Sequence, residues 1–144
     1  MPRRGAALLV ACAWLSVTTI GLAELPRTGH PTYERTAEWI NANTPPDASV
    51  AAMDIGLVGF RIGERRVVDM CSLVHAEGAA EIAAGRSDWW LDRQPDYVVL
   101  HRPPREYFEK PAFEREDFAA QYTAVADPYI GIRISGRRYP ATPK

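Results

Sequence analysis

The chain has 144 residues, which suits one modest domain, and 47% of them are hydrophobic, enough for a core. Its 17 basic and 18 acidic residues give a net charge of −1. Binding to nucleic acid requires clustered positive charge, so this balance argues against a nucleic-acid partner.

Residues 1–24 form a distinct first segment. Arg3 and Arg4 precede an uncharged stretch from Gly5 to Ala23. As a helix this stretch would be about 28 Å long, close to the thickness of the hydrocarbon core of a bilayer. Because the arginines come first, the positive-inside rule predicts that the remainder lies outside the cytoplasm.

Three interpretations of this segment remain open. A retained helix would make a single-pass cell-membrane protein, with the lipid bilayer as a partner. A signal peptide cleaved near Gly21-Leu22-Ala23 would release a secreted or periplasmic domain. A lipobox at Cys12 is disfavoured, because apolar residues follow the cysteine. All three place the rest of the chain in an extracytoplasmic compartment.

The rest of the chain divides into a linker (25–31), a domain (32–138) and a frayed tail (139–144). In chain order, the domain is expected to begin with a helix that is capped by Thr32 and ends at Asn43, followed by a strand at 48–54, a turn or short helix at 55–63 and a strand at 65–70. Two helices are then expected within 75–94, with a break near Gly85, followed by a strand at 95–101 and a short helix at 112–120. A hairpin at 121–138 that turns at Asp127-Pro128 ends the domain. This order predicts a small layered α/β sheet of two or three layers. Its central strands are parallel, an antiparallel hairpin closes it, and one N-terminal hydrophobic helix precedes it.

The carboxyl ends of parallel strands meet at one edge of a sheet, where ligands gather. Asp54 and Asp69 end neighbouring predicted strands at that edge, so they are candidates for binding sugar hydroxyls or a metal. The alternative is that each caps a helix or turns the chain. Gly56 follows Asp54 but belongs to no phosphate-binding glycine motif, which argues against a nucleotide site.

Two further residues are candidates for substrate binding. His75 could join Asp69 and Glu77 in a metal site, although a helix N-terminus explains the same residues. Trp89 could stack on a sugar, with one of Trp89 and Trp90 in the core and the other half-exposed. No complete catalytic constellation is visible, and neither a cofactor nor a metal is predicted. Cys71 has no partner for a disulfide, because Cys12 lies in the apolar segment.

Three stretches in this order resemble a known family: "AEWINANTPPDASVAAMDIGLVGF", "RRVVDMCSLVH" and "QPDYVVLH". Together with the preceding hydrophobic segment they are similar to the C-terminal extracytoplasmic domain of polytopic bacterial glycosyltransferases of the GT-C class. Those enzymes take sugar from a polyprenyl-phosphate donor. The similarity covers roughly residues 6–135, and its most specific parts are Asp54-Ile55-Gly56 with Gly59, Val68-Asp69 with Leu73, and Pro95-Asp96-Tyr97.

The chain also departs from that family. Ser72 stands where members tend to have a glycine before the leucine. Such enzymes also carry many membrane helices, with their catalytic aspartates in early extracytoplasmic loops, whereas only one possible membrane helix is predicted here. The resemblance therefore implies an accessory domain, either a truncated gene product or a single-pass subunit, that binds a cell-envelope glycan or docks on a membrane transferase. The alternatives are a small metal-dependent or carbohydrate-active hydrolase using Asp54, Asp69 and His75, and a structural envelope protein.

Overall fold

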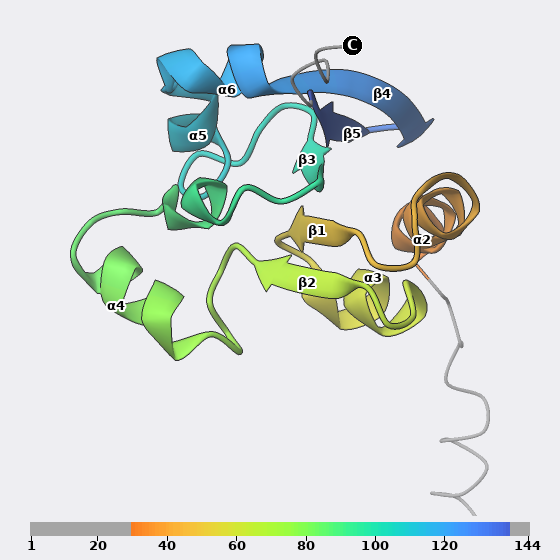
Figure 1. Cartoon of the computed structure of the whole chain (residues 1–144), viewed down its shortest axis with the longest axis horizontal. Coiled ribbons are helices and arrows are strands. Elements are labelled where there is room, and N and C mark those ends of the chain that lie inside the picture. The colour runs from red at the N-terminus through yellow and green to blue at the C-terminus, as the bar shows by residue number, and fades with distance from the viewer. Residues whose placement is uncertain (1–29, 139–144) are drawn as a thin grey trace, which may run out of the picture.

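The computed structural model describes residues 30–138. The predicted membrane or signal segment, most of the linker and the tail lie outside these residues. The described residues form a mixed α/β fold built on a five-stranded sheet (Figure 1). No helix between residues 30 and 138 has the length and apolar character needed to span a bilayer.

The sheet combines a parallel half with an antiparallel half. Its strand order is β2-β1-β3-β5-β4. β1 pairs in parallel with both β2 and β3, whereas β5 runs antiparallel to β3 and to β4. The strands are β1 (Ser49–Ala52), β2 (Arg66–Asp69), β3 (Tyr97–His101), β4 (Tyr122–Tyr129) and β5 (Ile132–Arg137). The predicted parallel centre and C-terminal hairpin are thus confirmed.

Helices cover both faces of the sheet, which gives three layers (Figure 1). The first face carries α2 (Pro31–Asn43) and α3 (Ile55–Arg61). The second face carries α4 (Ala76–Ala83), the 3-10 helix η1 (Trp89–Arg93), α5 (Lys110–Glu114) and α6 (Glu116–Gln121).

Alternation along the central strands explains this layering. Val50 and Ala52 of β1 pack in the cluster beneath α2 and α3, whereas Ala51 packs in the cluster that contains η1. In β3, Val99 belongs to the first cluster and Leu100 to the second. Because successive side chains of a strand point to opposite faces, these continuous apolar runs are typical of strands buried on both sides.

Two predicted boundaries are wrong. The hairpin turns at Ile130-Gly131, because Gly131 supplies a φ of +82°. Pro128 lies within β4, an edge strand, where a residue without an N–H is tolerated. The first helix has His30 as its N-cap residue and Pro31 in its first turn, so Thr32 lies inside the helix and does not cap it.

Candidate functional site

The side chains of Asp54 and His101 meet at the carboxyl edge of the parallel strands. Asp54 follows β1 by two residues, and His101 is the last residue of β3, the parallel neighbour of β1. Nε2 of His101 lies 3.1 Å from Oδ2 of Asp54. The side chain of Asp54 remains 41% exposed, so this carboxylate can still accept hydrogen bonds from a ligand.

Glu109 holds the other side of the His101 ring. Its side chain is fully buried, and Oε1 lies 2.8 Å from Nδ1 of His101. The backbone N–H of His101 donates to both carboxylate oxygens, and the N–H of Arg105 donates to Oε2 at 2.8 Å. Glu109 therefore fixes both the ring of His101 and the loop that follows β3.

These contacts set the charge of His101. The hydrogen bond to Glu109 raises the pKa of His101 above its ordinary value, while burial of the ring acts in the opposite direction. The negative charges of Glu109 and Asp54 raise the pKa further. The imidazolium form is thus stabilised between two carboxylates.

Tyr33 of α2 joins the same series of groups. Burial, followed by the hydrogen-bonding and charge effects of the nearby Asp54 carboxylate, raises the pKa of Tyr33, so the phenol stays neutral. The ring of His30 stacks on the ring of Tyr33 at 4.6 Å between centroids. Tyr33, Asp54, His101 and Glu109 therefore form a polar series that joins α2, the segment between β1 and α3, the end of β3 and the N-cap of α5.

A pocket of about 630 Å³ opens beside this series. Its walls come from the start of α2, from the loop after β3, and from the β4–β5 turn, with lining residues His30, Thr32, Tyr33, 101–106 and 130–132. Both Tyr33 and His101 line the pocket and both interact with Asp54, so a ligand seated there would meet a fixed set of donors and acceptors.

Asp69, by contrast, serves the local fold. It is fully buried at the end of β2, in register with Ala52 of β1. Its two carboxylate oxygens accept the backbone N–H groups of Cys71 and Val74, each at 3.0 Å. This is the turn-forming role that the sequence left as an alternative, and it accounts for both oxygens.

Trp89 and His75 lie on the other face of the sheet. Trp89 is 3% exposed, and its indole N–H donates to the carbonyl of Met70. Trp90 is fully buried as well, so the prediction that one of the pair is half-exposed is wrong. His75 is the N-cap residue of α4, with its ring centroid 6.1 Å from that of Trp89. Neither residue lines the pocket beside His101.

The predicted trio of Asp54, Asp69 and His75 is not joined by any hydrogen bond or ion pair that the structure describes. Within residues 30–138, no group of three or more His, Cys, Asp or Glu side chains is arranged to hold a metal ion. Gly56 lies in the first turn of α3, and a Cβ added to it would meet nothing within 4 Å. Of the five candidates from the sequence, only Asp54 contacts residues of the pocket.

Cys71 is unsuited to nucleophilic chemistry. Burial, followed by the charges of Asp69, Asp54 and Glu109, raises the pKa of its thiol to about 11. Because the thiolate is the reactive form, this cysteine remains a protonated, weakly reactive group at neutral pH.

A sequence family described as a domain of unknown function, DUF8728, matches residues 23–141. The chain belongs to the DUF8728 family. No curated protein and no solved structure matches the chain. The DUF8728 match includes every residue of the polar series and of the pocket.

His101, Glu109 and Tyr33 were not predicted from the sequence as site residues. One signal for His101 was available, since it ends the third parallel strand at the edge that singled out Asp54 and Asp69. Glu109 gave no such signal, because it lies in a segment that reads as a polar loop, and its burial depends on the loop folding back onto β3.

Proposed function

We propose that this DUF8728 domain is a membrane-anchored extracytoplasmic accessory domain that binds a cell-envelope glycan. In this proposal it is related to the C-terminal domain of GT-C glycosyltransferases and positions a glycan for a separate membrane transferase, without catalysing transfer itself. The observation that carries the proposal is the polar series from Tyr33 through Asp54 and His101 to Glu109, which borders an open pocket.

The chemistry of this pocket suits a sugar. Sugar hydroxyls both donate and accept hydrogen bonds, so they are best bound by polar groups that are held in place and can still form a further hydrogen bond. Asp54 does not itself line the pocket, but its half-exposed carboxylate lies 3.1 Å from His101, which does, so it can accept from a hydroxyl at the pocket edge. The stacked rings of Tyr33 and His30 offer an apolar surface for the C–H groups of a sugar ring. Glu109 and the backbone N–H groups that it binds hold the arrangement rigid.

The same geometry favours binding over proton transfer. Each ring nitrogen of His101 faces a carboxylate, and the raised pKa favours the imidazolium, which cannot act as a base. The hydrolase alternative required Asp54, Asp69 and His75 to act together. Asp69 instead directs both oxygens to its own turn.

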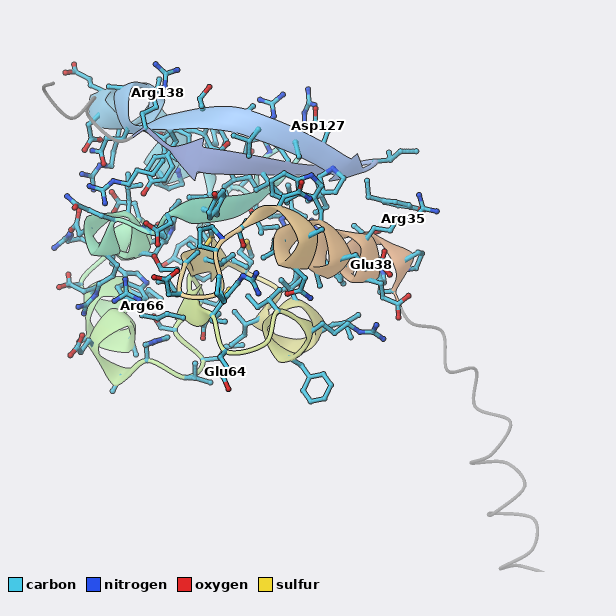
Figure 2. The ribbon with its side chains drawn as sticks, turned by 45° about the vertical axis from the view of Figure 1, so that its right-hand side comes forward. Arg35, Glu38, Glu64, Arg66, Asp127 and Arg138 are labelled. Carbon is cyan, nitrogen blue, oxygen red and sulfur yellow. The ribbon has the colours of Figure 1, made fainter. Side chains whose placement is uncertain are left out.

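The glycan proposal can be tested by NMR titration of the full chain in detergent with arabinan, mannan and galactan oligosaccharides. We expect saturable shifts of the Tyr33 and His101 ring signals with at least one of them. Asp54→Asn should abolish these shifts. Glu64→Gln is the matched control, because Glu64 is an exposed carboxylate on the turn before β2 and points into solvent (Figure 2). A flat titration with all three glycans would reject the proposal.

The location of the domain requires a separate test. Alkaline phosphatase fused after Lys144 is active only outside the cytoplasm, whereas green fluorescent protein fused there fluoresces only inside. We expect an active phosphatase fusion in the membrane fraction. Activity in the soluble periplasmic fraction would instead indicate a cleaved signal peptide, and an inactive phosphatase with a fluorescent partner fusion would place the domain in the cytoplasm.

A further inference from the structure

Arg105, one of the residues that line the pocket, indicates which kind of glycan could bind there. Three cationic groups from the end of β3 and the loop after it line this pocket: His101, Arg102 and Arg105. His101 is neutralised by Asp54 and Glu109 on its two sides. Arg102 pairs with Asp127 of β4 at 3.2 Å. Within residues 30–138, the guanidinium of Arg105 forms no hydrogen bond or ion pair.

The acidic groups of the pocket do not neutralise Arg105 either. Glu106 also lines the pocket, but it pairs with Lys110 at 2.9 Å. The positive charge of Arg105 acts to lower the pKa of both Tyr33 and His101, which is consistent with a guanidinium near the polar series. The wall that faces a ligand therefore carries one unpaired positive charge.

The backbone of Arg105 is held in place. Its N–H donates to Oε2 of the buried Glu109 at 2.8 Å, and its carbonyl accepts from the N–H groups of Glu109 and Lys110 at 3.1 and 3.0 Å. Pro103 and Pro104 come directly before it and restrict the chain further. A fixed backbone with a free guanidinium is suited to binding one group at a defined position.

We propose that the glycan bound by this pocket is acidic, and that Arg105 binds its carboxylate or phosphate group. This inference rests on the proposed function. A guanidinium binds carboxylate and phosphate through paired, charge-assisted hydrogen bonds. The acid group lies on Arg105, and the hydroxyls of the same sugar ring bind Asp54 and Tyr33. A uronic acid and a sugar phosphate present the same chemistry, so experiment must distinguish them.

The test uses sugars that differ only at carbon 6: glucose, glucuronate and glucose 6-phosphate, and the same series from galactose, with inorganic phosphate alone as a further probe. The full chain in detergent is titrated and followed by the side-chain signal of Arg105 and the ring signals of Tyr33 and His101. We expect at least one acid form to bind about tenfold more tightly than its neutral parent. A preference for glucuronate or galacturonate would identify the ligand as a uronic acid, and a preference for the 6-phosphate would identify it as a sugar phosphate.

Arg105→Gln should remove this preference, and Arg105→Lys should restore part of it. Arg66→Gln is the matched control. Arg66 is an exposed arginine at the start of β2, and it lies well away from Asp127, the partner of Arg102 (Figure 2). Higher salt should weaken binding of the acid forms alone.

The outcomes separate the two proposals. Equal affinities for acid and neutral forms, unaffected by Arg105→Gln, would overturn the acidic-glycan inference and leave glycan binding standing. Phosphate binding that depends on Arg105, with no response to any sugar, would support the anion site and count against the glycan. No response to any probe would overturn both.

Discussion

Nδ1 of His101 lies 2.8 Å from a carboxylate oxygen of Glu109, a side chain with no exposure to solvent. Glu109 also receives the backbone N–H of His101 and that of Arg105. One buried carboxylate thus sets the protonation of a pocket residue, the end of β3, and the course of the loop that carries Arg105. Removing it should affect both the stability and the chemistry of the pocket.

Glu109→Ala is expected to destabilise the domain by roughly 3 kcal/mol, because it leaves the backbone N–H groups of His101 and Arg105 without an acceptor. Glu109→Gln retains the shape and loses the charge. It should lower the pKa of His101, since the desolvation that opposes protonation remains. Urea unfolding measures the first effect, and NMR titration of the His101 ring measures the second. An unchanged pKa of His101 in Glu109→Gln would contradict the assigned cause.

The stability of the domain should depend on pH through His101. Its pKa is higher in the folded state than the ordinary value of about 6.5 expected of the unfolded chain. The folded state therefore binds the proton more tightly. The stabilisation is complete below about pH 6.5 and is lost as the pH rises through the folded-state pKa.

Urea unfolding between pH 5.5 and 8.5 measures this loss. Glu109→Gln should flatten the dependence, because it removes the main cause of the raised pKa. An equal slope in wild type and Glu109→Gln would show that another group is responsible.

The sequence was a good guide to elements with a strong local signal. The apolar runs around Val50, Val68 and Val99 gave the three parallel strands, and the glycines and prolines between them marked the breaks. The hairpin turn was misplaced because two signals competed. Asp127-Pro128 is a common turn pair, but Gly131 alone adopts a left-handed φ there, a difference that depends on register with β5.

The site was predictable only in part, because the two aspartates look alike in the sequence. Asp69 ends the parallel strand β2, and Asp54 comes two residues after the parallel strand β1. Their roles differ because of contacts that form only in the fold. Two backbone N–H groups of the following turn donate to Asp69, whereas His101 at the end of β3 pairs with Asp54. The burial of Glu109 depends on packing between segments that carry no periodic pattern, so no local rule indicates it.

Substitution of the two aspartates should separate these roles. Asp69→Ala leaves two backbone N–H groups without their acceptor at a buried site and should cost about 2–4 kcal/mol. Asp54→Ala removes a partly solvated contact and should cost about 1 kcal/mol or less, while abolishing glycan binding. Chemical denaturation and ligand titration of both variants decide the matter. Loss of binding in a stably folded Asp69→Ala variant would contradict the structural role given to Asp69.

Two helical glycines provide a further matched pair. Helix propensity alone favours alanine over glycine by roughly 1 kcal/mol. A Cβ on Gly56 would meet nothing within 4 Å, so Gly56→Ala should stabilise the domain by about 0.5–1 kcal/mol. A Cβ on Gly78 would lie 1.9 Å from Oγ of Ser72 and 2.3 Å from the ring of Trp89.

Gly78→Ala should therefore destabilise the domain by about 3 kcal/mol despite the gain in propensity, because the buried indole of Trp89 cannot move aside without losing its bond to Met70. Thermal and urea unfolding of the two variants measure the difference. Trp89→Phe tests this explanation. Because the single phenyl ring of phenylalanine is smaller than the two-ring indole, Gly78→Ala should destabilise the Trp89→Phe variant much less than it destabilises the wild type. If the two costs simply add, Trp89 is not the group that excludes a side chain at position 78.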